Sequence, residues 1–197
     1  MGKIISLMSF ERYNQLIKAH GTQVDDSLKH QLKKLFIESD LKLAVAESCT
    51  GGLVCNLLTD VPGASTYFLG GIVSYTNDAK QNLLSVSPQT LAKFGAVSEE
   101  TVLEMARGVR ARFSNEVNAE RIIGVSVSGI AGPGGGSPEK PAGMVWIGLS
   151  AQDKDHAWIF QWSGNRAENK MQSARAVMII LLQYLKSYLN EKDRSSS

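Results

Sequence analysis

The part of this sequence best suited to chemistry is a turn that carries a hydroxyl, a thiol and two glycines. It is Ala46-Glu-Ser-Cys-Thr-Gly-Gly52, which follows an apolar run and precedes apolar residues at helical spacing. A strand, a turn and a helix are therefore predicted in that order. The first amides of such a helix are expected to point outward and to suit an anionic ligand or an oxyanion, with Ser48 and Thr50 beside them. The alternative is that Ser48 or Thr50 simply caps the helix.

A lysine is the best candidate for a base. Lys80 falls in the first turn of a helix predicted at residues 78–84, where the positive end of the helix dipole favours the neutral amine. The alternative is an ordinary solvated lysine. The histidines, His20, His30 and His156, are scattered along the chain, and no Cys, His and Asp residues cluster at metal-ligand spacing. The sequence therefore favours neither a metal site nor a Ser-His-Asp triad.

A second candidate for ligand binding is the segment 129–143, which is too rich in glycine and proline for a regular element. Residues 132–137 lack the spacing of a dinucleotide fingerprint or a Walker A motif, yet successive glycine amides can form an anion-binding concavity. The alternative is a flexible surface loop. In the strand predicted just before it, at residues 122–128, valines face one side while Ser126 and Ser128 face the other, where both hydroxyls need partners.

The elements that position these residues follow from the periodicity of the apolar side chains and from turn residues. Strands are predicted at residues 41–46, 68–75, 122–128, 144–151 and 156–162, and helices at residues 25–39, 50–60, 78–84, 98–113 and 168–189. The last two strands are expected to be antiparallel, because their connection is short. Residues 1–27 are expected to form an N-terminal extension, in which residues 10–19 could be helical, and residues 190–197 a polar tail.

The composition narrows the class of protein. The 197 residues include 43% hydrophobic and 20% charged ones, as in an ordinary globular protein with one main domain. The formal net charge of +2 is too small to indicate a protein that binds nucleic acid or a membrane surface, so a small-molecule ligand fits better. The only cysteines, Cys49 and Cys55, do not suggest a disulfide framework. With no secretory leader or membrane span in the sequence, a cytoplasmic location is expected.

Four motifs in the same order carry a resemblance to a known family. They are Ala46-Glu-Ser-Cys-Thr-Gly-Gly52, Ser74-Tyr-Thr-Asn-Asp-Ala-Lys80, Gly95-Ala-Val-Ser-Glu99 and Ser128-Gly-Ile-Ala-Gly-Pro133. The sequence from about residue 28 to 187 resembles the CinA C-terminal domain family. A domain of this type is expected at residues 28–189, in a stand-alone form without the larger N-terminal domain of other members. The resemblance implies a three-layer α/β/α sandwich with a mixed β-sheet, and assembly into a homo-oligomer.

The resemblance also implies an activity. Active members of the family are nicotinamide-nucleotide amidases, which hydrolyse the carboxamide of nicotinamide mononucleotide to nicotinate mononucleotide and ammonia in pyridine-nucleotide salvage, with no cofactor or metal. By matching position, Ser48 is expected to be the nucleophile, with Tyr75 and Lys80 as its activating partners. The expected substrate-binding residues are Thr50, Gly51, Gly52, Ser128, Gly129 and Arg166.

Two positions depart from the family pattern. Where members commonly have Gly-Asp-Arg followed shortly by Val-Arg, this chain has Gly164-Asn-Arg166 and then Asn169-Lys170. An acid is lost at Asn165, and Lys170 replaces an arginine, which is not a conservative exchange at a bidentate anion site. The alternative to an amidase is therefore a weakly active or inactive nucleotide-binding or regulatory module of the same fold.

Overall fold

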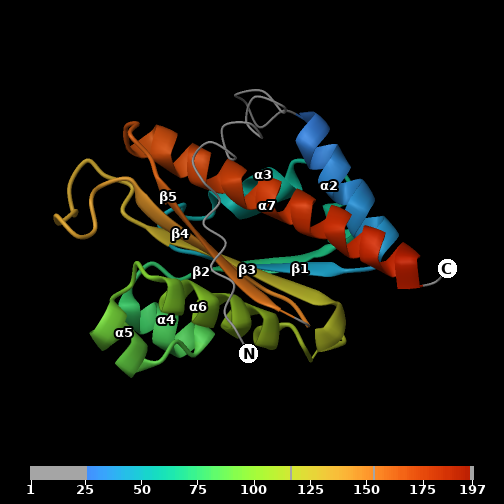
Figure 1. Ribbon diagram of the computed structural model, residues 1–197, viewed down its shortest axis with the longest axis horizontal. Coiled ribbons are helices and arrows are strands. Elements are labelled where there is room, and N and C mark those ends of the chain that lie inside the picture. Colours follow the sequence, from blue (N-terminus) through green and yellow to red (C-terminus); the bar gives the residue numbers. More distant parts are fainter. Residues whose placement is uncertain (1–25, 116, 153, 196–197) are drawn as a thin grey trace.

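A five-stranded mixed sheet forms the centre of the molecule (Figure 1). The computed structural model describes residues 26–115, 117–152 and 154–195. In the order β2-β1-β3-β4-β5, β1 is parallel to both of its neighbours, whereas β3, β4 and β5 pair antiparallel. The strands are β1 (Lys42–Glu47), β2 (Phe68–Val73), β3 (Ile122–Gly129), β4 (Met144–Ser150) and β5 (Asp155–Gln161). All the predicted strands, and the antiparallel pairing of the last two, are confirmed.

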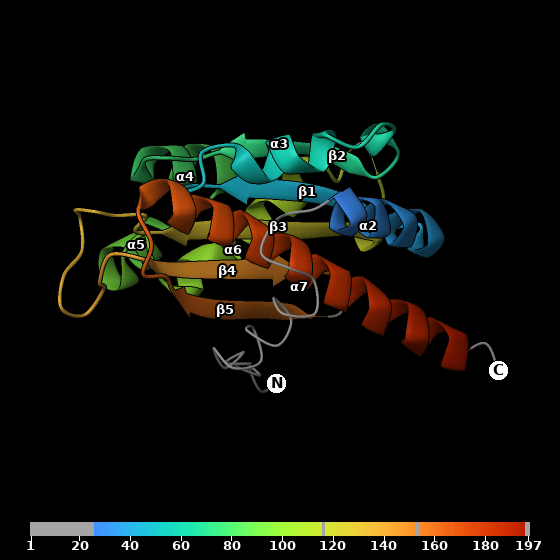
Figure 2. The ribbon, with the colours of Figure 1, turned by 90° about the horizontal axis from the view of Figure 1, so that it is seen from above.

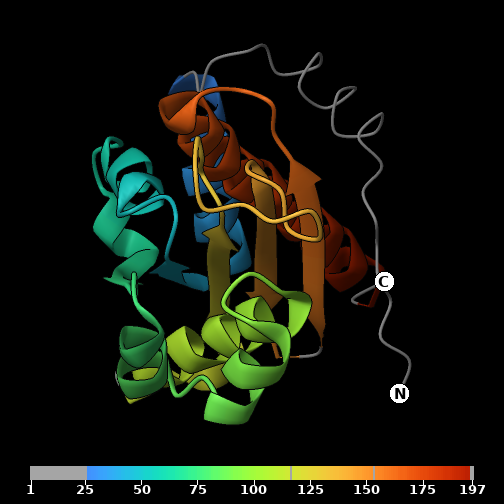
Figure 3. The same cartoon turned by 90° about the vertical axis from the view of Figure 1, so that its left-hand side faces the viewer.

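Helices cover both faces of the sheet (Figures 1 and 3). On one face lie α2 (Asp26–Ser39), α3 (Leu53–Thr59) and α7 (Arg166–Ser195), and on the other α4 (Asn77–Leu84), α5 (Pro88–Phe94) and α6 (Glu99–Arg112). Short 3-10 helices, η1 (Ala64–Thr66) and η2 (Ala119–Arg121), precede β2 and β3. The three-layer α/β/α architecture expected from the resemblance is confirmed.

The two faces of the sheet bury different kinds of side chain, because successive strand residues point in opposite directions. In β1, Leu43 and Val45 join a large core cluster formed with α2, α3 and α7, whereas Ala44 and Ala46 join a smaller cluster under α4 to α6. The small residues let helix α6 come close to the sheet. At Gly124 of β3 an added Cβ would lie 2.1 Å from the carbonyl oxygen of Ala106 in α6, so any side chain there would push the helix away.

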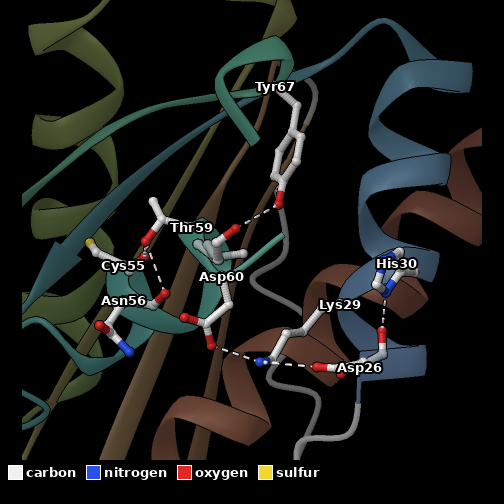
Figure 4. Close-up of polar contacts among 9 residues, drawn as sticks. Asp26, Lys29, His30, Cys55, Asn56, Thr59, Asp60 and Tyr67 are labelled. Atoms are coloured by element: carbon white, nitrogen blue, oxygen red, sulfur yellow. Dashed lines mark hydrogen bonds and ion pairs between the residues drawn. The ribbon is translucent and has the colours of Figure 1, made fainter. Parts of the chain in front are cut away.

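Polar contacts fasten α2 to the end of α3 (Figure 4). The Lys29 ammonium in α2 is 2.7 Å from a carboxylate oxygen of Asp60, just after α3, and the Tyr67 hydroxyl donates to the carbonyl oxygen of Leu58 at 3.3 Å. The Tyr67 ring also stacks on Phe36, with 4.8 Å between the ring centroids. These contacts hold α3, and hence the turn before it, against the rest of the layer.

Several element boundaries differ from the predictions. No helix was predicted between residues 84 and 98, yet Ser87 and Pro88 begin one: the Ser87 hydroxyl accepts from the amides of Gln89 and Thr90, and proline occupies the first turn of α5. Helix α3 begins at Leu53 rather than near residue 50, since Gly51 and Gly52 have the left-handed φ values of 63° and 97°.

The ends of the described chain also differ. Helix α7 begins earlier than predicted and continues to Ser195, so most of the expected polar tail is helical although the side chains of residues 190–194 are polar and exposed. The helix predicted at residues 25–39 is confirmed as α2, and it includes residues 26 and 27 at the end of the expected extension. The helix expected at residues 10–19 lies outside the described residues.

Candidate active site

The candidate site lies where the three parallel strands end. Strands β2, β1 and β3 are parallel, so their carboxyl ends meet at one edge of the sheet. The connection through α3 runs over one face and that through α4 to α6 over the other, which makes the end of β1 a topological switch point, the usual ligand crevice of such sheets. The 130–143 loop and the start of α7 lie at this same end (Figure 2).

A cavity of about 250 Å³ opens at this edge. Most of the site residues predicted from the sequence line it, namely Ser48, Tyr75, Lys80, Ser128, Gly129 and Arg166, although they come from five different parts of the chain. Cys49, residues 96–97 and the glycine loop at 130–132 and 134 complete the lining. The predicted residues Thr50, Gly51 and Gly52 are not among the lining residues.

Ser48 and Lys80 meet at the buried end of the cavity. Lys80 Nζ lies 2.9 Å from Ser48 Oγ and donates a second hydrogen bond, at 2.7 Å, to the carbonyl oxygen of Ser74. The Lys80 side chain is only 1% exposed. This burial lowers the pKa of Lys80 from 10.5 to about 8 because water no longer solvates the ammonium, while the nearby Cys49 acts in the opposite direction. Burial, rather than the helix dipole invoked from the sequence, is the main cause of the shift.

Tyr75 and Arg166 meet at the open rim. Arg166 Nη2 donates to the Tyr75 hydroxyl at 2.8 Å, and Arg166 Nη1 donates to the carbonyl oxygen of Gly132 at 3.0 Å. The Tyr75 side chain is 58% exposed. The structure therefore joins Tyr75 to the guanidinium of Arg166, not to Ser48 and Lys80, with which the resemblance grouped it.

The amides at the start of α3 are not free, as the sequence analysis expected them to be. The carboxylate of Glu47 accepts hydrogen bonds from the amides of Gly52 at 2.9 Å, Val54 at 3.2 Å and Cys55 at 2.8 Å. A buried carboxylate therefore already occupies the place where an anionic ligand was expected. The sequence analysis missed Glu47; an acidic residue at the end of an otherwise apolar strand was the signal that it needed a buried partner.

The remaining residues of the turn have structural surroundings. Thr50 is fully buried, and its hydroxyl has no hydrogen-bond partner among the described residues. Gly51 is exposed, and an added Cβ there would lie 3.6 Å from Lys170 Nζ. Lys170 thus places a positive charge beside the turn of Ser48. Thr50, Gly51 and Gly52 shape this turn, and nothing in the geometry places them against a ligand in the cavity.

The predicted polar face of β3 is confirmed and leads to a wall of the site that sequence reasoning missed. Ser126 Oγ donates to the carbonyl oxygen of Val102 at 2.5 Å, and Ser128 Oγ to that of Ala96 at 2.7 Å. The second bond holds residues 96–97, which precede α6, against the cavity. Because its proton is already donated, the Ser128 hydroxyl offers a ligand its acceptor lone pairs. The motif containing Ala96 carried the resemblance, but no role was assigned to it.

The start of α7 places Arg166 in its first turn. The Asn165 side chain accepts from the amides of Ala167 at 3.0 Å and Glu168 at 3.1 Å, while the Glu168 carboxylate accepts from the amide of Asn165 at 2.8 Å. This reciprocal pair is a capping box. Asn169, one turn later, is buried and donates to the carbonyl oxygens of Ala131 and Gly164. The departure at Asn165 therefore leaves the helix cap intact.

The cysteines are poorly placed to act as nucleophiles. Burial raises the pKa of Cys49, which lines the cavity, from 9.0 to about 12, although the positive charge of Lys80 acts in the opposite direction. Burial and the Glu47 carboxylate also raise the pKa of Cys55. Both thiols are protonated near neutral pH. Within residues 26–115, 117–152 and 154–195, no group of three or more His, Cys, Asp and Glu residues could hold a metal ion.

Comparison with known proteins identifies the family of this chain. Residues 25–185 match the model of the CinA C-terminal domain. A CinA-like protein of Chlorobium limicola is 45% identical over 172 residues, covering 85% of this chain and 38% of the relative. A putative competence-damage inducible protein of Halothermothrix orenii is 43% identical, covering 82% of this chain and 38% of the relative. The chain thus spans well under half the length of these relatives.

Solved structures give the same result. The competence damage-inducible protein A of Klebsiella pneumoniae superposes with a TM-score of 0.75 at 31% identity, covering 81% of this chain and 96% of that one. The competence/damage inducible protein CihA of Agrobacterium tumefaciens gives a TM-score of 0.70 at 36% identity, covering 83% and 96%. In the part of the chain that the structure describes, no helix is long and apolar enough to cross a membrane. The chain belongs to the CinA C-terminal domain family.

Proposed function

We propose that this protein hydrolyses the carboxamide of nicotinamide mononucleotide to nicotinate mononucleotide and ammonia. The observation that carries the proposal is the pair formed by Ser48 Oγ and Lys80 Nζ, 2.9 Å apart at the buried end of a cavity. An amide is a poor electrophile, so its hydrolysis needs an activated hydroxyl and an acid for the departing nitrogen. A buried lysine with a pKa of about 8 can exchange a proton with a neighbouring hydroxyl near neutral pH.

In the first half of the reaction, neutral Lys80 accepts the proton of Ser48 as Oγ forms a bond to the carboxamide carbon. The C–N bond then breaks, and the Lys80 ammonium returns this proton to the leaving nitrogen, which departs as ammonia. An ester between Ser48 and the nicotinoyl group remains. In the second half, Lys80 accepts a proton from water as the hydroxide attacks the ester carbon. The C–O bond to Ser48 then breaks, the Lys80 ammonium returns its proton to Ser48 Oγ, and the nicotinic acid released loses its own proton to water as the carboxylate.

The open rim supplies the means to hold the nucleotide. Arg166 presents a guanidinium, which suits a phosphate, beside the glycine loop. Since Glu47 occupies the amides at the start of α3, these amides are excluded as the phosphate site. We assign the phosphate to Arg166, the carboxamide to Ser48, and an acceptor contact for the carboxamide nitrogen to Ser128.

The test is ammonia release from nicotinamide mononucleotide by the purified protein without added metal. Ser48→Ala is expected to remove nearly all turnover, about 100-fold or more, while calorimetry still detects nucleotide binding. Cys49→Ala is the matched control, because it removes a neighbouring nucleophile that burial keeps protonated, and it should retain most activity. An inactive Cys49→Ala with an active Ser48→Ala would refute the assignment.

A binding or regulatory module is the second candidate, favoured by Lys170 in place of the family arginine beside the turn of Ser48. In that case calorimetry should detect nucleotide binding to a wild-type protein that releases no ammonia even at high protein concentration. Restoring the guanidinium with Lys170→Arg distinguishes a weakened amidase, which gains turnover, from a pure binding module, which does not.

A further inference from the structure

Glu47 is a buried acidic residue that the proposed mechanism does not use. It is the last residue of β1, directly before Ser48, and its side chain is fully buried. It does not line the cavity, so it cannot touch a substrate there. A buried carboxylate is costly unless hydrogen bonds satisfy it, and here three backbone amides do so.

The carboxylate closes the turn that carries Ser48. One oxygen of Glu47 accepts from the amides of Gly52 and Val54 and the other from that of Cys55, so the side chain links the residue before Ser48 to the first turn of α3. Gly52, the N-cap residue, has no side chain with which to cap this seven-residue helix. Glu47 supplies the missing cap from outside the helix. It thereby fixes both ends of the turn at residues 48–52, which carries Ser48.

The backbone of Glu47 leads to Lys80. Its carbonyl oxygen accepts from the amide of Ser74 at 2.8 Å and from the Ser74 hydroxyl at 3.4 Å. The carbonyl oxygen of Ser74 in turn accepts from Lys80 Nζ at 2.7 Å. Glu47 is therefore linked to both Ser48 and Lys80. Its side chain holds the turn that carries Ser48, and its main chain binds Ser74, whose carbonyl oxygen accepts from Lys80.

We propose that Glu47 is a positioning residue that keeps Ser48 Oγ within hydrogen-bond distance of Lys80 Nζ. The proposal rests on the function proposed above. Its physical basis is that proton transfer requires the hydroxyl and the amine to stay in contact, and a displacement of about 1 Å can reduce a rate about 100-fold. A purely structural cap would instead affect stability alone.

The test compares two carboxylates that accept hydrogen bonds at the start of seven-residue helices. Glu47→Gln replaces an acceptor oxygen by an NH₂ group that faces a backbone amide. Glu104→Gln makes the same change at α5, where the Glu104 carboxylate accepts from the Ser87 amide at 2.8 Å and the Thr90 hydroxyl at 2.6 Å, and Glu104 does not line the cavity. Glu104→Gln leaves the Ser87 cap of α5 in place and affects one amide rather than three, so it serves as the control for losing a carboxylate beside a short helix.

The readouts are kcat and KM for nicotinamide mononucleotide, the midpoint of thermal unfolding, and the rate at which a fluorophosphonate labels Ser48. Glu47→Gln should lower kcat and the labelling rate about 10- to 100-fold, with KM changed less than about threefold. Glu104→Gln should lower the unfolding midpoint less than Glu47→Gln does and leave kcat and labelling unchanged. Equal kcat and labelling rates in the two variants would overturn the proposal.

Two further measurements keep the outcomes separate. If Glu47→Gln does not fold, Glu47→Asp keeps the charge but is one methylene too short to reach all three amides, and it should show the same loss of kcat and labelling; normal values for both would overturn the proposal. A wild-type protein that is labelled at Ser48 but releases no ammonia refutes the proposed substrate only, and the labelling rates then decide the role of Glu47. If the wild-type protein is not labelled at Ser48 and releases no ammonia, Ser48 is not an activated nucleophile, and the positioning role of Glu47 is refuted with it.

Discussion

The two ends of the candidate site are built differently. At the inner end, Lys80 is 1% exposed, and main-chain contacts fix both it and the turn of Ser48. At the outer end, Tyr75 is 58% exposed, and its contact with Arg166 joins two side chains on separate elements. Burial shifts a pKa and fixes geometry, whereas an exposed pair can change partners when a ligand arrives. The inner end therefore suits bond making, and the rim suits recognition.

The largest expected effect is at the inner end. Lys80→Arg should reduce kcat by at least about 100-fold, because a guanidinium stays protonated and cannot accept the Ser48 proton. Lys80→Met, which also removes the charge, should be equally inactive. The measurement is single-turnover ammonia release. An active Lys80→Arg protein would show that Lys80 provides only a positive charge, and the contrast between the two ends would lose its basis.

The pH dependence of kcat/KM tests the role of Lys80 in the wild-type protein. Since only the neutral amine accepts a proton, kcat/KM should rise as the pH is raised through about 8. For stability, the folded pKa of about 8 lies below the unfolded value of 10.5, so between these values the unfolded chain binds more protons. The contribution of Lys80 to the free energy of unfolding therefore rises with pH across this window and is lowest below pH 8.

That stability effect is measured as a difference between proteins. The raised pKa values of Cys49 and Cys55 act in the opposite direction above pH 9, and that of Cys49 also depends on the charge of Lys80, so wild type and Lys80→Met are compared below pH 9. Denaturant unfolding of both proteins on either side of pH 8 isolates the lysine. A stability difference that does not change with pH would contradict a buried, shifted amine.

At the rim, Arg166→Ala should raise KM for nicotinamide mononucleotide about 10- to 100-fold with a smaller effect on kcat, since a charge-assisted hydrogen bond is worth about 1.5–3 kcal/mol. Nicotinamide riboside, which lacks the phosphate, is the matched substrate: it should be poor with wild type, and Arg166→Ala should leave its KM unchanged. An equal change in KM for both substrates would show that Arg166 does not bind the phosphate.

Tyr75→Phe decides to which end of the site the tyrosine belongs. Its hydroxyl contacts Arg166, so its loss should raise KM about fivefold and leave kcat nearly unchanged. The resemblance groups Tyr75 with Ser48 and Lys80, and in that role the same change should lower kcat about 100-fold. Steady-state kinetics separate the two cases, and a loss of kcat would show that the tyrosine turns inward when substrate binds.

How much of this site the sequence could predict depends on how far apart in the chain the contacting residues lie. Strand β3 and helix α6 were predicted because their periodicity is local, and the face of β3 on which Ser126 and Ser128 lie followed from the alternation of its residues. The contact between Arg166 and Tyr75 joins residues 91 apart, and no local pattern encodes it. The capture of three amides by Glu47 depends on the shape of the intervening turn. Helix α5 was missed because Ser-Pro can either end a helix or begin one.

The smallest expected effect concerns the departure at Asn165. Its side-chain oxygen accepts from the amides of Ala167 and Glu168, a task that an aspartate performs equally well. Asn165→Asp should therefore leave kcat and KM unchanged and raise the free energy of unfolding by about 0.3–1 kcal/mol, because a negative charge at the start of α7 interacts favourably with the helix dipole.

Asn165→Ala is the control for that change, since it removes the cap and should cost about 1 kcal/mol of stability. Because Arg166 occupies the next position, the loosened first turn should also raise KM slightly, whereas kcat depends on the inner pair and should not change. Denaturant unfolding and steady-state kinetics on the three proteins test this. A rise in kcat of about tenfold in Asn165→Asp would contradict it, because an acid at the rim would then take part in bond making, and the division between the inner end and the rim would not hold.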